Sequence, residues 1–151
     1  MDINQSAPVI AHEQLRIAAD VQTVWDVLSD LEHWPNWNKA VSSVSVHGTV
    51  ASGTSFDWKA GPGTIKSRIA EVDAPNRIVW TGVTFGIRAV DAFSFEASDG
   101  GTLVREDESW EGLLARLFRS RMERTLSSSL RDGLRSLKAE AERRAGAAAA
   151  A

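Results

Sequence analysis

The last third of the chain carries its most regular pattern of hydrophobic and polar positions. Between Leu113 and Arg144, apolar residues recur at steps of three and four residues over roughly eight helical turns. This spacing predicts one long amphipathic helix with charged residues along its opposite face. Such a stripe must pack against another surface, because tertiary packing supplies most of the stability of a helix. The stripe consists of Leu114, Leu117, Phe118, Met122, Leu126, Leu130, Leu134, Leu137 and Ala141.

The residues before this helix alternate with the period of β-strands and supply that surface. Asp20 is predicted to cap a short helix that ends at Leu31. A second short helix is expected at about 35–40, because Pro35 disfavours the helical conformation at Trp34. Short turns connect the strands, so consecutive strands should be antiparallel neighbours. The predicted strands are 12–18, 41–47, 54–59, 64–72, 77–83, 87–96 and 102–111.

These elements predict an α+β fold. A curved antiparallel sheet of six to seven strands would wrap around the long C-terminal helix, with two short helices after the first strand. A chain of 151 residues is expected to form a single domain, which we assign to residues 10–144. Residues 1–9 are mixed and polar and residues 145–151 are rich in alanine, so both ends are predicted to be flexible.

Composition and charge narrow the classes of function. The formal net charge is -3, which gives no electrostatic reason to expect binding to nucleic acid or to an anionic membrane. The basic residues between Arg116 and Arg144 alternate with acidic ones and are interpreted as a solvated helix face. The chain has no cysteine, no signal peptide and no apolar run of membrane-spanning length. We therefore expect a cytoplasmic protein without stable membrane insertion.

Four segments resemble one known superfamily in the same order and spacing. They are Val24–Asp30 with Trp34–Trp37, Asp73–Trp80, Gly100–Val104, and Glu108–Gly112. Together they are similar to the START-like, helix-grip superfamily (SRPBCC), and to its polyketide cyclase/dehydrase and lipid transport branch, over about residues 10–144. The resemblance implies a deep apolar cavity between the sheet and the C-terminal helix. It also implies hydrophobic ligands such as lipids, sterols, quinones or aromatic polyketides, and no cofactor.

Aromatic side chains are the candidates for such a cavity. The chain has six tryptophans and no tyrosine, and side chains on one strand face alternate sides. These rings either fill the core or leave a gap for a flat apolar ligand. Trp34 and Trp37 either plug the edge of the sheet or gate the entrance. The candidate ligand-binding residues are Trp34, Trp37, Phe56, Trp58, Trp80, Phe93, Phe95, Trp110, Phe118 and Met122.

The last strand supplies the candidate catalytic residues. Glu106 and Glu108 share a face with Trp110, so they lie inside if Trp110 does. A buried carboxylate must be paired, hydrogen-bonded or protonated, and a raised pKa would suit it to general acid or base catalysis. Arg68 or Arg88 on neighbouring strands could be the partner. The alternative is a cross-strand ion pair on the convex side of the sheet, since one bulge would invert the alternation.

The remaining motifs support no other chemistry. His12, His33 and His47 are scattered and have no second ligand at metal-binding spacing, so no metal site is expected. The serines at 127–129 lack a nucleophile elbow and a partnered base.

Three functions remain open. The first is a binding protein for a small hydrophobic molecule. The second is a cofactor-independent polyketide cyclase or aromatase, in which Glu106 or Glu108 moves a proton and Arg68 polarises a carbonyl. The third is an interaction protein with a vestigial cavity. A carrier needs only an apolar cavity, whereas a cyclase also needs an ionisable group beside its ligand. The sequence leaves the oligomeric state open between monomer and homodimer.

Overall fold

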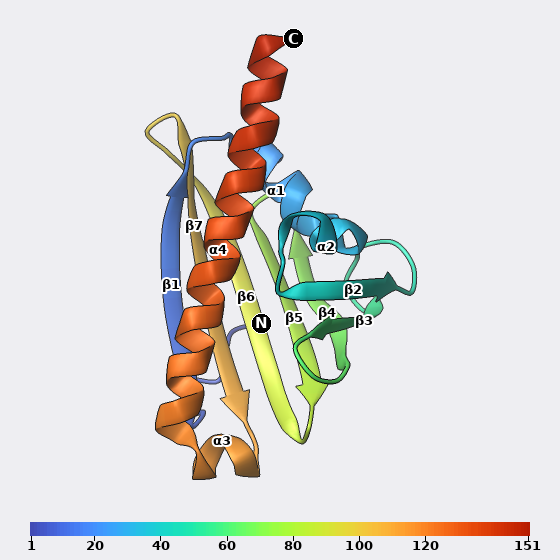
Figure 1. The fold of residues 1–151 in the computed structure, drawn as a ribbon, viewed down its shortest axis with the longest axis vertical. Coiled ribbons are helices and arrows are strands. Elements are labelled where there is room, and N and C mark those ends of the chain that lie inside the picture. The colour runs from blue at the N-terminus through green and yellow to red at the C-terminus, as the bar shows by residue number, and fades with distance from the viewer.

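The computed structural model describes residues 1–151 and has the predicted helix-grip architecture. Seven antiparallel strands form one sheet in the order β1-β7-β6-β5-β4-β3-β2, and a long helix crosses its concave face (Figure 1). The elements are β1 (Val9–Ile17), α1 (Val21–Ser29), η1 (Leu31–His33), α2 (Trp34–Trp37), β2 (Val41–Val46), β3 (Ser55–Ala60), β4 (Ile65–Asp73), β5 (Arg77–Thr84), β6 (Ile87–Ser98), β7 (Gly101–Glu111), α3 (Leu113–Leu117) and α4 (Arg119–Ala150).

The short helices after β1 form where the sequence predicts them. The Asp20 carboxylate accepts a hydrogen bond from the Thr23 backbone N–H at 2.7 Å and thereby caps α1. Between the helices lies the 3₁₀ turn η1, and Pro35 stands in the first turn of α2, where its missing N–H costs nothing. The Trp34 indole N–H donates to the Leu28 carbonyl at 2.8 Å. This buried bond ties α2 to α1.

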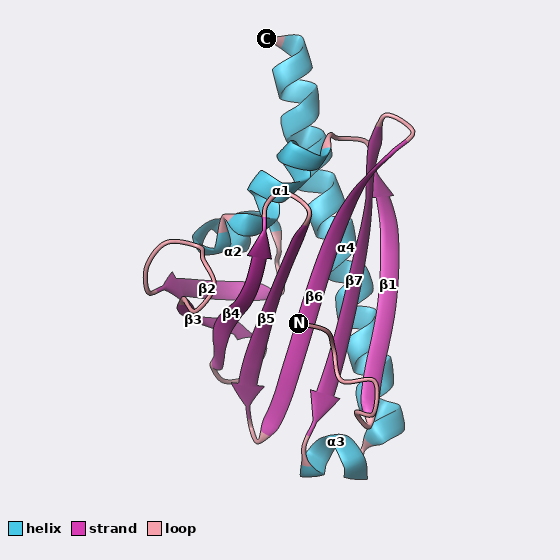
Figure 2. Cartoon of the chain, turned by 180° about the vertical axis from the view of Figure 1, so that it is seen from behind, coloured by secondary structure: helices cyan, strands magenta, loops and turns pink.

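The main core lies between the concave face of the sheet and the helices α1 and α4. Leu134, Leu137 and Ala141 of α4 pack there with Ile78 and Phe95 of the sheet. A smaller cluster lies on the convex face, where Ile3 is buried against Val79 and Ala92. Figure 2 shows the N-terminal segment crossing that outer face. The first strand accordingly begins at Val9 and not at His12.

The C-terminal helix differs from the prediction at both ends. It does not start at Leu113, because the backbone leaves helical geometry at Phe118 (φ -116°, ψ 34°) and separates α3 from α4. The helix also continues to Ala150, past the predicted end at Arg144, since alanine is the strongest helix former. Among the helices, none has the length and apolar character needed to cross a membrane.

Candidate functional site

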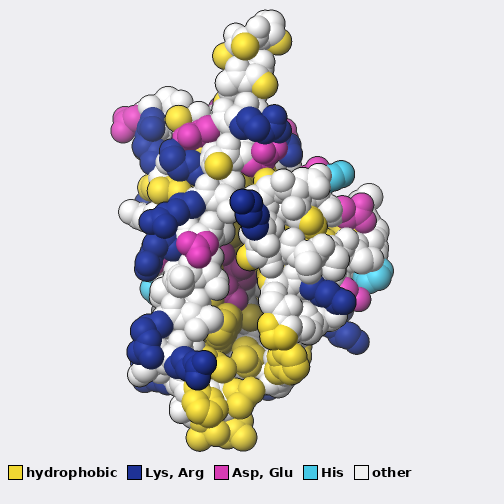
Figure 3. All heavy atoms as spheres, viewed as in Figure 1, with side chains coloured by type: hydrophobic (Ala, Val, Ile, Leu, Met, Phe, Trp, Pro, Cys, Tyr) yellow, Lys and Arg dark blue, Asp and Glu magenta, His cyan; other side chains and the backbone are white.

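A cavity of about 210 Å³ lies between α4, α2 and the concave face of the sheet. Figure 3 shows a hollow beside α4 with acidic side chains on its floor. The volume exceeds the ~100 Å³ below which we would regard a cavity as vestigial. Its lining residues are Leu28, Trp34, Trp37, Asn38, Ala40, Val41, Trp58, Ala60, Trp80, Asp91, Phe93, Glu106, Glu108, Ser129, Leu130, Asp132, Gly133 and Leu137.

Aromatic rings form one wall of this cavity. The ring of Trp34 lies 5.4 Å from that of Trp58 and 5.4 Å from that of Trp80, between centroids. Trp80 in turn stacks on Phe93 at 5.4 Å. The Trp58 indole N–H donates to the Ser67 hydroxyl at 3.0 Å, which fixes the orientation of that ring. Rings that contact one another in this way make a preformed apolar surface.

Three carboxyl groups lie beside these rings on the same face of the sheet, where Asp91 pairs with Trp80 and Glu106 pairs with Phe93. Asp91 of β6 is directly opposite Glu108 of β7, and Glu106 follows on the same face of β7. One oxygen from each group lies within 4.8 Å of the others. Asp91 and Glu106 are only 7% and 6% exposed, and no salt bridge includes any of the three. Arg131, on α4, pairs instead with Glu13 at 3.2 Å.

Burial and mutual repulsion change the acidity of these groups. Burial, together with the charges of Glu108, Glu106 and Asp107, raises the pKa of Asp91 well above its ordinary value. Burial and neighbouring carboxylates likewise raise the pKa of Glu106. Burial raises the pKa of Glu108 to about 7, although the hydrogen bond from Trp110 opposes this rise. All three groups therefore keep their protons to a higher pH than free carboxyl groups do, and Glu108 titrates near neutral pH.

Three buried polar atoms in the cavity lining have no hydrogen-bond partner in the protein. They are Trp37 Nε1, Asp91 Oδ1 and Glu106 Oε2. An unpaired buried polar group is costly, and native proteins leave few of them. All three therefore leave hydrogen-bonding positions open in the lining of one cavity.

The same carboxylates are the residues that could hold a metal ion. Histidine spacing predicts no metal site, whereas the structure brings Asp91, Glu106 and Glu108 together from two strands. Three oxygen donors suit a hard cation such as Mg²⁺ or Ca²⁺. Such ions usually take six or more ligands, so the protein would supply about half of the coordination shell.

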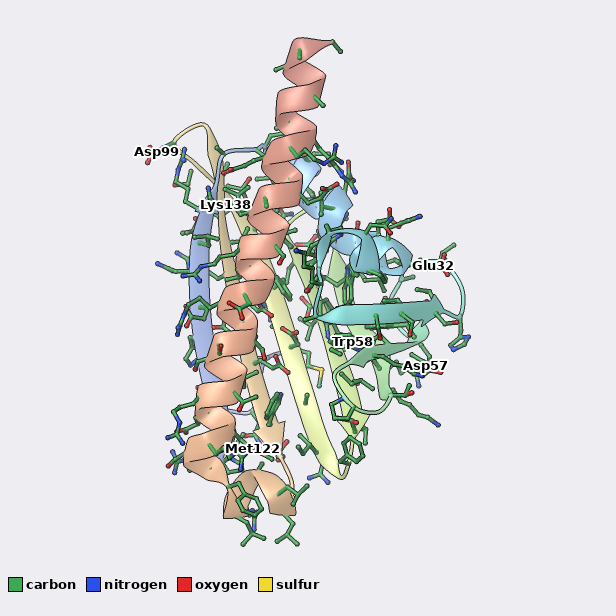
Figure 4. The ribbon with its side chains drawn as sticks, in the orientation of Figure 1. Glu32, Asp57, Trp58, Asp99, Met122 and Lys138 are labelled. Atoms are coloured by element: carbon green, nitrogen blue, oxygen red, sulfur yellow. The ribbon has the colours of Figure 1, made fainter.

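Half of the predicted ligand-binding residues line the cavity. These are Trp34, Trp37, Trp58, Trp80 and Phe93. Phe56 and Phe95 are buried in the core behind the cavity, and Trp110 packs in a separate cluster, where its indole N–H donates to Glu108 at 2.6 Å. Met122 belongs to that cluster, far from Trp58 in Figure 4. Phe118 is 51% exposed at the break between α3 and α4, so its predicted place in the cavity is wrong.

Two predictions about the carboxylates are corrected. The alternative of a convex ion pair for Glu106 and Glu108 is wrong, because both line the cavity on the concave side. The predicted pairing with Arg68 is also wrong. Its neighbours Ser67 and Ile69 are buried, so Arg68 projects from the opposite face of β4 and is exposed. Arg88 is exposed as well.

Sequence reasoning missed Asp91, although a signal for it was present. Asp91 alternates with Phe93 and Phe95, so the argument that placed those rings inside also places Asp91 inside. Ser129, Asp132 and Gly133 of α4 were missed for a different reason. They are not part of the apolar stripe, and only the rotation of α4 over the sheet shows which polar positions border the cavity.

The sequence of residues 9–142 matches the family model described as polyketide cyclase / dehydrase and lipid transport. The chain belongs to this family. No curated protein sequence matches the chain. The family description combines a cyclase chemistry with lipid transport, and both are consistent with an apolar cavity under a long helix.

Several solved structures share this fold. A hypothetical protein, jhp0584 of Helicobacter pylori, aligns with a TM-score of 0.82 at 16% identity, covering 92% of this chain and 91% of that one. A START superfamily protein of Mycobacterium smegmatis aligns at 0.77 and 15% identity, covering 89% and 97%. The di-domain aromatase/cyclase StfQ of the steffimycin pathway aligns at 0.79 and 20% identity, covering 91% of this chain and 52% of StfQ. At these identities, the likeness is one of fold.

Proposed function

We propose that this protein binds a compact, flat hydrophobic molecule that carries a hydrogen-bond-accepting oxygen. The observation that supports this most directly is the set of three unpartnered polar atoms in a cavity walled by tryptophan. The Trp37 indole donates a hydrogen bond, and Asp91 and Glu106, whose pKa values are raised, also donate one when they are protonated. A carbonyl or quinone oxygen accepts such bonds, whereas a carboxylate ligand would be repelled by an ionised Glu108.

The size of the cavity supports a ligand of one or two rings. Its volume of about 210 Å³ is below the range of ~300 to 1,000 Å³ that is usual for drug-sized ligands. Trp80 and Phe93 stack on each other and both line the cavity, so either ring could stack on an aromatic or quinonoid ligand. Asp91 and Glu106, which lie beside these rings on neighbouring strand positions, would then hold the oxygen at the edge of the ligand ring.

A larger side chain at Gly133 of α4 is expected to occupy the cavity and weaken ligand binding without unfolding the protein. A Cβ atom added at Gly133 meets nothing within 4 Å, and Gly133 lines the cavity. Gly133→Leu should therefore weaken binding at least tenfold. Gly146→Leu is the matched control, since Gly146 lies on the same helix, is equally free of contacts and does not line the cavity. Both changes should stabilise α4 by about 1 kcal/mol, because leucine is a better helix former than glycine.

Binding is measured by native mass spectrometry and thermal shift with 1,4-naphthoquinone, an aromatic β-diketone and a medium-chain fatty acid. At least one of the two carbonyl probes should raise the melting temperature of the unmodified protein, and the fatty acid should have the smaller effect. The proposal fails if neither carbonyl probe binds and no hydrophobic compound co-purifies. Equal binding by the Gly133→Leu protein would place the ligand outside this cavity.

A second candidate function is catalysis of an intramolecular aldol cyclisation, as the family description suggests. The observation that favours it is Glu108, whose pKa of about 7 suits a general base at neutral pH. Glu108 would remove a proton from a carbon between two carbonyls, and the resulting enolate would attack a third carbonyl. Protonated Glu106 would give its proton to the new alkoxide. The proton lost from carbon is thus balanced by the one gained on oxygen, and Arg68 has no part.

Glu108→Gln distinguishes catalysis from simple binding. If Glu108 is the base, this variant should lose at least a hundredfold in turnover of a poly-β-keto substrate analogue, because general base catalysis typically contributes ~10²–10⁴-fold. The unmodified enzyme should also show a rise in rate with an inflection near pH 7, which the variant lacks. A Glu108→Gln protein that binds the analogue and turns it over at the original rate would rule out this role.

A further inference from the structure

The end of the molecule at α3 exposes an unusual number of large apolar side chains. Seven large hydrophobic residues of the chain are exposed, and all except Met1 belong to this end. Leu113, Leu117 and Phe85 are 70%, 65% and 64% exposed. Scattered exposed leucines are ordinary, whereas a group of them marks an interaction surface. We call the six residues Val83, Phe85, Leu113, Leu114, Leu117 and Phe118 the apolar end.

Backbone contacts hold the two segments of the apolar end together. At Gly112, where φ is +126°, an added Cβ would lie 2.4 Å from the carbonyl oxygen of Gly86. This close approach, which only glycine allows, places the β5–β6 turn against the start of α3. Within α3 only Ala115 is buried, against the cluster of Val9 and Leu126. The backbone break at Phe118 separates α3 from α4, and the leucines of α3 are exposed.

Basic residues accompany the apolar end. Residues 113–124 contain four arginines and one acid, so their net charge is +3 within a chain of net charge -3. The acid, Glu123, accepts a hydrogen bond from Arg119 at 3.1 Å. Figure 3 shows hydrophobic side chains gathered at this end and basic ones beside them. The overall charge gave no reason to expect an acidic partner, but the distribution of charge does. The four arginines are Arg116, Arg119, Arg121 and Arg124.

We propose that the apolar end docks on the surface of an anionic lipid bilayer. Leucine and phenylalanine side chains would enter the boundary between headgroups and acyl chains, and the arginines would contact anionic headgroups. A second copy of the chain fits this surface less well, since a twofold contact would bring the two sets of arginines together. Such docking is peripheral, so no spanning helix is required. In Figure 3, the hydrophobic side chains continue from this end toward the hollow above the carboxylates.

Vesicle co-sedimentation tests the proposal without any knowledge of the cavity ligand. The protein should bind vesicles of phosphatidylcholine with 30% phosphatidylglycerol at low salt, bind pure phosphatidylcholine at least tenfold more weakly, and be released by 0.5 M NaCl. The double variants Leu117→Ser/Phe118→Ser and Arg121→Glu/Arg124→Glu should each bind at least tenfold more weakly than the unmodified protein. Arg135→Glu/Lys66→Glu makes the same charge change at exposed positions elsewhere and should bind normally.

Circular dichroism establishes that each variant is folded, which these exposed positions should allow. The proposal is overturned if the unmodified protein ignores anionic vesicles, or if both double variants at the apolar end bind as well as the control. It is also overturned if sedimentation velocity shows a dimer that Leu117→Ser/Phe118→Ser dissociates, because a second copy would then occupy the surface.

Discussion

Trp34→Ala is expected to lower the free energy of unfolding by about 3 to 5 kcal/mol, the cost usual for removing a buried tryptophan. Trp34 is 4% exposed, and its ring contacts those of Phe56, Trp58 and Trp80. The substitution also removes the donor to the Leu28 carbonyl, which would remain buried without a partner. Urea unfolding measures the change, and the melting temperature should fall by roughly 10 °C.

Trp37→Ala is the informative comparison. Trp37 is a tryptophan of the same short helix, but it is half-buried and its indole N–H bonds to nothing in the protein. Its loss should cost less than half as much stability and should instead weaken binding of a carbonyl probe. Both tryptophans line the cavity, so equal destabilisation by the two variants would contradict the larger structural role that the ring contacts and the buried hydrogen bond give to Trp34.

The fold was predictable because its signals are local and agree with one another. The side chains of Phe56, Ile78, Phe93 and Phe95 are inside as the strand alternation requires. Asp20 caps α1 as its side-chain chemistry suggests. The error at the start of the C-terminal helix has a physical cause as well. A periodic pattern predicts which residues share one face of a helix, but it does not predict whether a sheet covers that face. Leu117 belongs to the pattern and is nevertheless 65% exposed.

The cavity was only partly predictable, because it depends on contacts between distant elements. Alternation placed Glu106 and Glu108 on one face, but it could not tell that Asp91 lies directly opposite Glu108. The prediction that Arg68 is the partner was wrong because Ser67 and Ile69 occupy the buried face of β4, which leaves Arg68 on the exposed face. Whether a ring fills the core or lines a gap is decided by side-chain packing across the whole sheet, as the different positions of Trp80 and Trp110 demonstrate.

Raising the pH from 5 to 8 is expected to lower the free energy of unfolding. Glu108 alone should contribute about 2 kcal/mol, because its pKa of about 7 lies two pH units above 5 and each unit is worth about 1.36 kcal/mol before allowance for solvent. Asp91 and Glu106 act in the same direction. In the unfolded chain, Asp91, Glu106 and Glu108 lose their protons near pH 4 to 4.5. In the folded protein their pKa values are raised, that of Glu108 to about 7. At a pH between the unfolded and the folded pKa values, the folded state binds more protons than the unfolded state. The free energy of unfolding therefore falls as the pH rises through this range.

The ion-paired Glu140 does not contribute to this window. Hydrogen bonds from Arg143 and Arg144 lower the pKa of Glu140 to about 2, so its stabilisation is complete at pH 5 and is lost only in stronger acid. Glu106→Gln removes one buried acid while keeping its shape. Its melting temperature should therefore depend less on pH than that of the unmodified protein, and it should exceed that of the unmodified protein at pH 8 by several degrees.

Glu96→Gln is the control for this comparison, because Glu96 is an exposed glutamate on the neighbouring strand and pairs with Arg105 at 3.0 Å. The dependence of its melting temperature on pH should run parallel to that of the unmodified protein. All of these proteins keep the three histidines, so histidine titration cannot cause a difference between them. A flat profile for the unmodified protein between pH 5 and 8 would show that the acids are already neutralised, for instance by a bound cation. In that case a chelator should restore the slope, and the carbonyl ligand would lose the protonated groups on which its recognition depends.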